Sequence, residues 1–316
     1  MKKICVTGAN GFIGSSICKT LSSLGEPVKG FVRKLYPSLK TSGVEYQSVG
    51  DICSDINWKD QLNGYDYVIH CAGKAHVMNK NDDPNIYRLA NVESTRRIAE
   101  HAVKAGVKRL IFLSTIKVNG ESKSNNYNNK IITIEDKPNP QDEYARSKLE
   151  AENILLEISA RTDLEVVIVR LPLVYGHGVK GNLAKLIKLI KTGIPLPFSL
   201  VKNQRSMIGI NNLVDMLLAC IEHPNAAEKT FLVSDGKDLS TRELIKLIAS
   251  SMDSSSKLFP VPISLLRFVS KIIGKEDEIN RLLGSFQVDT SYTREILNWK
   301  PTISVEEEIR EMVQFL

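Results

Sequence analysis

The feature that most constrains the fold is a glycine-rich turn near the N-terminus. Residues 7–14 read TGANGFIG and lie between a short apolar run, residues 4–7, and a helical pattern that continues to about Leu24. Glycines permit a tight bend and a close backbone approach, and the N-terminus of the following helix offers unpaired N–H groups to a phosphate. Strand, turn and helix in this order predict a dinucleotide-binding unit. The residues expected at the cofactor are Gly8, Asn10, Gly11, Phe12, Ile13 and Gly14.

Apolar runs alternate with helical patterns through the first half of the chain. This alternation is typical of a doubly wound parallel sheet, an α/β Rossmann fold that binds ligands at the carboxyl ends of its strands. After residue 171 helical patterns dominate, and one further run, residues 231–234, is expected to rejoin the sheet. We predict a Rossmann domain over residues 1–171 and a smaller substrate-binding lobe over residues 172–316. The expected strands of the first domain are residues 4–7, 28–32, 44–49, 67–70, 110–114 and 166–170.

Composition and charge exclude several classes of protein. The formal net charge of +6 is spread along the chain, which suits an anionic substrate but gives no basic stripe for nucleic acid. The five cysteines lack CxxC spacing, so we expect reduced thiols rather than disulfides or a metal site. Residues 1–3 lead directly into a strand and no apolar stretch is long enough to span a bilayer. These features predict a cytoplasmic protein.

Two amphipathic segments, residues 183–191 and 265–273, admit two interpretations. The first segment is basic, and a helix lying on a membrane surface is one interpretation. We favour an ordinary surface helix that buries Leu186, Ile187 and Ile190, because the pattern stops at Gly193 after about three turns. The second segment is interpreted in the same way, so no membrane partner is expected.

The end of the second predicted strand bears on the choice of cofactor. An acidic residue there would bind the ribose 2′-hydroxyl of NAD, whereas an arginine would accommodate the 2′-phosphate of NADP. The chain has Arg33 at this position and no acid. Arg33 therefore favours NADP(H), with NAD(H) as the second option if Arg33 is only a solvated surface charge.

A tyrosine and a lysine stand at the head of a later helical pattern. Residues 139–140, Asn-Pro, look like a helix N-cap and first turn, and Tyr144 and Lys148 then share a face that is apolar further along. A free tyrosine has a pKa of about 10, which a nearby ammonium is expected to lower. Tyr144 would then carry the proton that accompanies a hydride transfer. Ser114 and Thr115, at the end of the fifth strand, are placed to supply a second hydroxyl.

These features together resemble the extended short-chain dehydrogenase/reductase family, and within it the nucleotide-sugar 4-epimerases, dehydratases and 4-keto reductases. The resemblance runs through nearly the whole chain. The matching motifs are TGxxGxxG at residues 7–14, Gly50-Asp51-Ile52, His70-Cys71-Ala72-Gly73, Asn91-Val92, Ser114-Thr115, Tyr144 with Lys148, Leu171-Pro172, Val174-Tyr175-Gly176, Arg205 and Leu297-Asn298-Trp299.

The resemblance implies roles for individual residues. Thr115, Tyr144 and Lys148 would be catalytic, and a homodimer is an expectation of the family. Arg205 would meet a substrate diphosphate, since its fork of donors suits phosphate oxygens, although an ordinary surface charge is the alternative. The further cofactor contacts would be Asp51, Ile52, Ala72, Gly73, Asn91, Ser114, Tyr144, Lys148 and Pro172. The substrate contacts would be Lys74, Thr115, Tyr144, Asn182, Arg205 and Arg281.

Departures from the family pattern concern the substrate. Leu173 stands where an asparagine often lies, and Val118-Asn119-Gly120 replaces Val-Tyr-Gly. We favour a 4-keto reductase of a UDP-4-keto-6-deoxy-N-acetylhexosamine in surface-polysaccharide biosynthesis, because residues 283–289 resemble that subgroup and Arg33 fits NADPH.

Three alternatives to the reductase share its fold. A UDP-glucose or UDP-N-acetylglucosamine 4-epimerase uses the same tyrosine and lysine. A dehydratase is disfavoured, because Ile116-Lys117 stand where its acidic pair would follow Thr115. A non-catalytic dinucleotide sensor is the remote alternative, since such proteins usually lack Tyr144 or Lys148.

Overall fold

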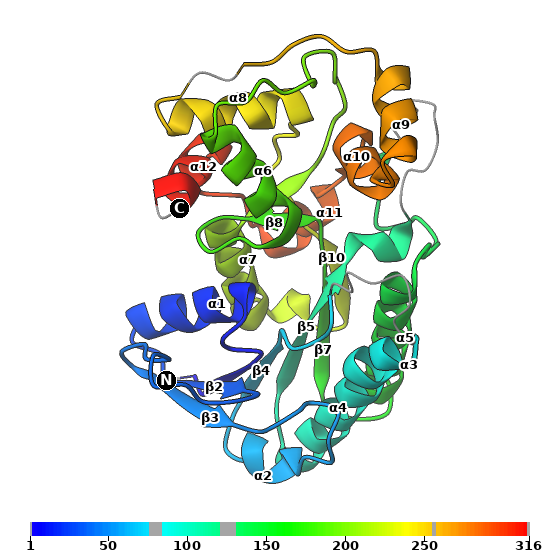
Figure 1. The fold of residues 1–316 in the computed structure, drawn as a ribbon. Coiled ribbons are helices and arrows are strands. Elements are labelled where there is room, and N and C mark those ends of the chain that lie inside the picture. The colour runs from blue at the N-terminus through cyan, green and yellow to red at the C-terminus, as the bar shows by residue number, and fades with distance from the viewer. Residues whose placement is uncertain (1, 76–83, 121–130, 255–256, 315–316) are drawn as a thin grey trace.

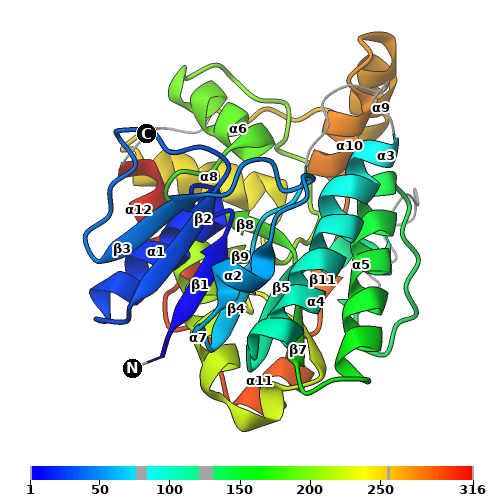
Figure 2. The same cartoon turned by 90° about the horizontal axis from the view of Figure 1, so that it is seen from below.

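A parallel sheet covered by helices on both faces forms the body of the protein (Figures 1 and 2). The computed structural model describes residues 2–75, 84–120, 131–254 and 257–314. The sheet has seven strands in the order β3-β2-β1-β4-β5-β7-β10, and the predicted doubly wound Rossmann fold is confirmed. The strands are β1 (Ile4–Thr7), β2 (Val28–Val32), β3 (Val44–Ser48), β4 (Tyr67–His70), β5 (Arg109–Thr115), β7 (Glu165–Leu171) and β10 (Lys229–Leu232).

The two faces of the sheet carry different helices. One face packs against α1 (Phe12–Ser23), α7 (Ile210–Glu222) and α11 (Ser291–Leu297). The other packs against α2 (Trp58–Leu62), α4 (Ser94–Ala105) and α5 (Glu143–Ser159). Because helices cover both faces, every residue of the central strand β5 is buried.

Residues beyond 171 divide between the sheet and a second lobe. The strand β10 lies parallel to β7 at the edge of the sheet, two residues earlier than the predicted run 231–234. The chain therefore returns to the sheet after it has begun the lobe. The lobe consists of α6 (Gly181–Lys191), α8 (Thr241–Ser251), α9 (Ile263–Ile272), α10 (Glu276–Leu283) and α12 (Val305–Gln314) around its own core.

Short strand pairs and a π-helix complete the fold. The pair β8 (Leu173–Tyr175) and β9 (Met207–Gly209) is parallel, as is the pair β6 (Ile131–Ile132) and β11 (Gln287–Val288). The short helix α3 (Pro84–Tyr87) leads into the π-helix η1 (Arg88–Glu93) and then into α4. All five cysteine thiols are free. None of the helices in the described ranges is long and apolar enough to cross a membrane.

The predicted start of α5 is wrong by three residues. The helix begins at Glu143, and its N-cap is Asp142, whose Oδ1 accepts a hydrogen bond from the Ala145 N–H at 2.7 Å. Asn139 instead donates its backbone N–H to the Val118 carbonyl at 2.8 Å, which holds residues 139–141 outside the helix. Asp142 stands directly before the first helical residue, where its side-chain oxygen can accept the N–H of the first turn.

The two amphipathic segments behave differently. The helix α6 buries Leu186, Ile187 and Ile190, as expected for a surface helix. The helix α9 contradicts the same expectation, because its inward side holds Leu266 and Ser270 while most of its apolar side chains face solvent.

A buried arginine ties α7 to the sheet. Arg109, at the start of β5, pairs with Glu165 at 2.6 Å and donates to the carbonyls of Ile221 at 3.2 Å and His223 at 3.0 Å. The last carbonyls of a helix have no partner within the helix, and a cation at this end also offsets the helix dipole. The Arg109 side chain therefore donates hydrogen bonds to carbonyls at the end of α7 that have no partner within the helix.

Replacing this arginine should destabilise the protein. Arg109→Met would leave the buried carbonyls without donors, so we expect the free energy of unfolding to fall by about 2–4 kcal/mol. Urea denaturation followed by circular dichroism measures the change. The exposed Arg310→Met is the matched control and should change stability by less than about 0.5 kcal/mol. Equal stability of the two variants would contradict the anchoring role.

Candidate functional site

The predicted cofactor residues gather at one edge of the sheet, where the parallel strands end. Each follows its strand by only a few residues, and the neighbouring strands bring them side by side. They are Gly8, Asn10, Gly11, Phe12, Ile13 and Gly14 after β1, Arg33 after β2, Asp51 and Ile52 after β3, Ala72 and Gly73 after β4, Ser114 at the end of β5 and Pro172 after β7.

The turn between β1 and α1 fits the pyrophosphate of a dinucleotide. Gly8 has a φ of +67°, and a Cβ there would lie 2.9 Å from the Ala72 nitrogen. A side chain at Gly14 would clash with the Gly8 carbonyl. Gly11 is the N-cap of α1, and no side chain caps that helix. The backbone N–H groups at the head of α1 therefore face a cradle free of side chains, which suits a phosphate.

A buried histidine fixes the turn against β4. The Thr7 hydroxyl lies 2.6 Å from His70 Nδ1 and accepts the Ala72 N–H at 3.2 Å, and His70 Nε2 lies 3.1 Å from the Thr95 hydroxyl. Burial lowers the pKa of His70 to about 3, so the ring is neutral near pH 7. His70 joins β1, β4 and α4 beneath the cofactor cradle. Sequence analysis named it only as part of a motif.

Asn91 connects the cofactor edge to α5 from the π-helix η1. Its Oδ1 accepts the Lys74 N–H at 2.8 Å, and its Nδ2 donates to the Lys74 carbonyl at 3.1 Å and to the Ser147 hydroxyl at 3.0 Å. Lys74, a predicted substrate contact, is thus held beside the helix that carries Tyr144. π-helical turns often occur at functional sites, where the extra residue re-aims a side chain.

The three predicted catalytic residues come together. Thr115, at the end of β5, faces Tyr144, and its side chain acts to lower the pKa of the Tyr144 hydroxyl. Lys148 lies one turn further along α5, and its Nζ is 3.9 Å from the centre of the Phe112 ring. The Tyr87 ring of α3 lies 6.3 Å from the Tyr144 ring, centre to centre. The arrangement presents one phenol and one hydroxyl to a common point.

The pKa values of Tyr144 and Lys148 differ from the expectation. Burial and the Asp142 carboxylate raise the pKa of Tyr144 to about 12, although the hydrogen bond from Thr115 acts in the opposite direction. Burial also lowers the pKa of Lys148 from 10.5 to about 7, against the attraction of Glu152. The predicted fall in the Tyr144 pKa is therefore wrong for this structure, because burial and the negative charge of Asp142 both disfavour the phenolate.

A buried ion pair missed by sequence analysis lies behind these residues. Glu152, two turns after Tyr144, binds Arg170 of β7, with Nη2 and Oε2 2.6 Å apart. The Ser114 hydroxyl also donates to Glu152, and Arg170 donates to the Asn119 amide oxygen at 3.0 Å. The signal available in the sequence was a carboxylate on the otherwise apolar face of α5.

The residues that follow Thr115 supply no acid. Ile116 is buried, and Lys117 pairs with Asp142 at 2.9 Å. The carboxylate nearest Tyr144 is therefore already engaged by Lys117 and by the first turn of α5. This geometry agrees with the argument against a dehydratase.

Two predicted substrate residues of the lobe lie together. Arg205 donates to the Arg281 carbonyl at 2.6 Å, and burial and the Arg281 charge lower the pKa of Arg205. The hydrogen bond from the Ala145 N–H and the charge of Lys117 lower the pKa of Asp142, and the Arg281 charge acts in the same direction. Two guanidinium groups in proximity are suited to an anion with several oxygens. Asn182 lies exposed in the first turn of α6.

Arg33 faces Asp51, another of the predicted cofactor contacts. Its Nε lies 3.8 Å from Oδ2 of Asp51, and both side chains are exposed. Asp51 Oδ1 accepts the Cys53 N–H at 2.9 Å, which fixes the carboxylate. The acid comes from the end of β3 rather than β2. A 2′-phosphate at Arg33 would also meet this carboxylate.

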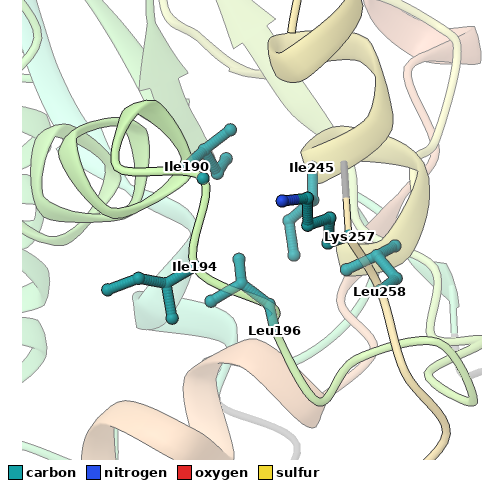
Figure 3. Close-up of a pocket in the computed structure, with 7 residues that line it drawn as sticks. Ile190, Ile194, Leu196, Ile245, Lys257 and Leu258 are labelled. Atoms are coloured by element: carbon teal, nitrogen blue, oxygen red, sulfur yellow. The ribbon is translucent and has the colours of Figure 1, made fainter. Parts of the chain in front are cut away.

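A small apolar cavity in the lobe is unrelated to this site. It has a volume of about 10 Å³ and lies between Ile190, Leu196, Ile245 and Leu258 (Figure 3). None of the predicted functional residues lines it. It is a packing gap, and the assignment of the site rests on the strand ends and α5.

The fold and the site define a class of enzyme: a Rossmann-fold oxidoreductase with a Thr–Tyr–Lys centre. The family model described as "NAD dependent epimerase/dehydratase family" matches residues 4–234. The chain belongs to this family, and the predicted recognition of an NAD(P)-dependent enzyme of the extended short-chain dehydrogenase/reductase group is confirmed.

Individual relatives agree with the family. The chain is 42% identical to a UDP-glucose 4-epimerase of Vibrio cholerae, over 99% of this chain and 95% of that protein. It is 26% identical to an N-acetyl-α-D-glucosaminyl-diphospho-ditrans,octacis-undecaprenol 4-epimerase of Escherichia coli O157:H7, over 86% of this chain and 81% of that protein. The structure of a UDP-glucuronic acid 4-epimerase from Bacillus cereus in complex with NAD is similar in fold, with a TM-score of 0.79, 20% identity and coverage of 100% and 98%.

The buried Lys148 should reduce stability in a pH-dependent way. Because its pKa falls from 10.5 unfolded to about 7 folded, the unfolded state holds the proton more tightly between these values, and wild-type stability rises with pH there. Lys148→Met removes the buried charge and leaves Glu152 paired with Arg170. We expect the free energy of unfolding of the variant to exceed that of the wild type by about 1–3 kcal/mol at pH 7. This difference should become smaller toward pH 10. If urea titrations at pH 7 show the variant to be less stable than the wild type, the buried charge of Lys148 does not destabilise the fold.

Proposed function

We propose that this protein is a UDP-sugar 4-epimerase. The observation that carries the proposal is that Thr115 faces Tyr144, with Lys148 one turn further along α5 and no carboxylate directly after Thr115. The relative from Vibrio cholerae, matched over almost the whole of both chains, supports the choice of a 4-epimerase over a 4-keto reductase.

Arg205 and Arg281 would bind the diphosphate of the substrate. Burial and the nearby charge of Arg281 lower the pKa of Arg205, and a diphosphate would offset this repulsion and accept hydrogen bonds from both guanidinium groups. Two relatives act on UDP-glucose and on a diphospho-undecaprenol-linked sugar, and both substrates contain a sugar diphosphate. We therefore assign the diphosphate to Arg205 and Arg281, and the sugar to the space beside Thr115 and Lys74.

The proposed chemistry places the proton on Tyr144. Bound NAD supplies the hydride acceptor at the carboxyl ends of the strands. Tyr144 is protonated at rest, so it would first pass its proton to Lys148 in its neutral form, one turn further along α5. The phenolate would then accept the proton of the C4 hydroxyl as the C4–H bond breaks, with Thr115 at the same oxygen, and would return that proton when the keto sugar is reduced on its other face. The ammonium of Lys148 would stabilise the phenolate between these two steps, which offsets the raised pKa of Tyr144.

A 4-keto reductase of a UDP-4-keto-6-deoxy-N-acetylhexosamine is the second candidate. The exposed Arg33 at the end of β2 favours it, because a reductase that consumes NADPH needs a partner for the 2′-phosphate. The homodimer expected from the family resemblance stays a prediction under either function.

Substrate conversion tests the function. Purified protein with a trace of NAD should interconvert UDP-glucose or UDP-N-acetylglucosamine and its C4 epimer without net consumption of cofactor, as followed by anion-exchange chromatography. Tyr144→Phe should lower turnover by about 10²-fold or more and leave NAD binding unchanged. Tyr87→Phe, a nearby aromatic of α3, is the matched control. Stoichiometric oxidation of NADPH with a 4-keto-6-deoxy sugar nucleotide, and no epimerisation, would favour the second candidate.

Cofactor choice is a separate prediction. We propose NAD(H) rather than the NADP(H) favoured by Arg33 alone, because Asp51 lies beside Arg33 and would repel a 2′-phosphate. Nucleotide-free protein should bind NADH about tenfold or more tightly than NADPH in fluorescence titrations. Asp51→Asn should reduce the difference in affinity between NADH and NADPH. Asp55 is an exposed acid of the same segment, and Asp55→Asn should leave this difference unchanged. Tighter binding of NADPH by the wild-type protein would overturn the choice.

A further inference from the structure

The helix α10, which carries Arg281, has few buried side chains. It lies beside α9 in the outer part of the lobe (Figure 1). Among the residues of α10 whose burial the structure describes, only Leu283 in the last turn is buried, whereas Glu276, Glu278, Asn280 and Arg281 are exposed. Burial of apolar surface therefore gives this helix little support, and polar contacts at its end decide where Arg281 lies.

Buried donors hold the end of α10. Asn203 is 0% exposed, and its Nδ2 donates to the Gly284 carbonyl at 2.7 Å and to the Leu282 carbonyl at 3.1 Å. Thr241, the first residue of α8, donates its hydroxyl to the same Leu282 carbonyl. The last carbonyls of a helix have no partner within the helix, so Asn203 and Thr241 supply the donors that the end of α10 lacks.

The Asn203 side chain is itself held in one orientation. Its Oδ1 accepts the Thr241 N–H at 2.9 Å, and its Nδ2 lies 3.4 Å from the Thr241 hydroxyl. The amide cannot turn without leaving buried donors and acceptors unpaired. Two residues further along, the backbone of Arg205 exchanges two hydrogen bonds with Leu239, and its side chain donates to the Arg281 carbonyl.

We propose that Asn203 is a positioning residue for the diphosphate site. The carbonyls of residues 281, 282 and 284 are all bound by side chains of Asn203 and Arg205, so one short segment fixes the backbone of Arg281 relative to Arg205. Two guanidinium groups can bind one diphosphate together only if the distance between them matches it. The inference rests on the proposed function, because it takes Arg205 and Arg281 to be the diphosphate ligands.

A second buried asparagine separates positioning from general stability. Asn212 of α7 is also 0% exposed. Its Nδ2 donates to Asp235 at 2.8 Å and to the Ile303 carbonyl at 2.9 Å, and its Oδ1 accepts the N–H groups of Thr302 and Ile303 at 3.0 Å. None of these partners is a predicted cofactor or substrate residue. Loss of the Asn212 amide would therefore leave as many buried groups unpaired without moving Arg281.

Calorimetric titration of the full chain with UDP tests the proposal. Asn203→Ala should weaken UDP binding by about tenfold or more, because the carbonyls at the end of α10 lose their donor and Arg281 moves away from Arg205. Asn212→Ala is the matched control, which should lower the unfolding temperature by a similar amount and bind UDP as the wild type does. In the epimerisation of UDP-glucose, the effect of Asn203→Ala should appear in KM more than in kcat.

Two further variants make every outcome decisive. Thr241→Val removes one donor to the Leu282 carbonyl, should weaken UDP binding by about threefold, and replaces Asn203→Ala if that variant does not fold. Arg205→Met should abolish most UDP binding. If Arg205→Met loses UDP while Asn203→Ala and Thr241→Val bind it as the wild type does, the positioning role is wrong and the proposed function stands.

The opposite result concerns the proposed function. If the wild-type protein does not bind UDP, or if Arg205→Met binds it unchanged, the assignment of the diphosphate to Arg205 and Arg281 is wrong, and the role of Asn203 fails with it. Equal weakening of UDP binding by Asn203→Ala and Asn212→Ala would show a general loss of structure and would also overturn the positioning role.

Discussion

The site depends on a buried ion pair between α5 and β7. Glu152 and Arg170 are both nearly inaccessible, and together with the Ser114 hydroxyl they lock the last residues of β5 against the helix that carries the tyrosine. A buried charge without its partner is strongly unfavourable, so α5 has one tolerated position relative to the sheet. That position is what brings Thr115 and Tyr144 to face each other.

Burial then sets the chemistry of the centre. The same low-polarity surroundings raise the pKa of Tyr144 to about 12 and lower that of Lys148 to about 7, so each group is held in or near its neutral form. Two buried neutral groups destabilise the folded state less than one buried charge without a partner would. The phenolate and the ammonium would form together as a proton moves, and each would stabilise the other at that moment.

The local sequence was sufficient to predict the helices and strands and the order of the motifs. The strand ends were predicted within one or two residues because buried parallel strands are continuous apolar runs, and the turn at Gly8 requires a positive φ that glycine adopts freely. The start of α5 was missed because Asn139 and Asp142 are both good caps, and only a contact from Val118 to Asn139 decides between them. The acid beside Arg33 was missed because it comes from a different strand.

The sequence by itself determined the Rossmann fold, the glycine cradle and the tyrosine–lysine spacing on α5, since these depend on local backbone freedom and on periodicity. The tertiary structure alone decided which distant groups share a low-polarity environment. It paired Glu152 with Arg170, set Asp51 beside Arg33, brought Arg205 to Arg281, and turned the apolar face of α9 outward. Electrostatic energies depend on distances and burial that spacing along a chain does not fix, and for that reason the pKa values of Tyr144 and Lys148 followed from the fold rather than from the motif.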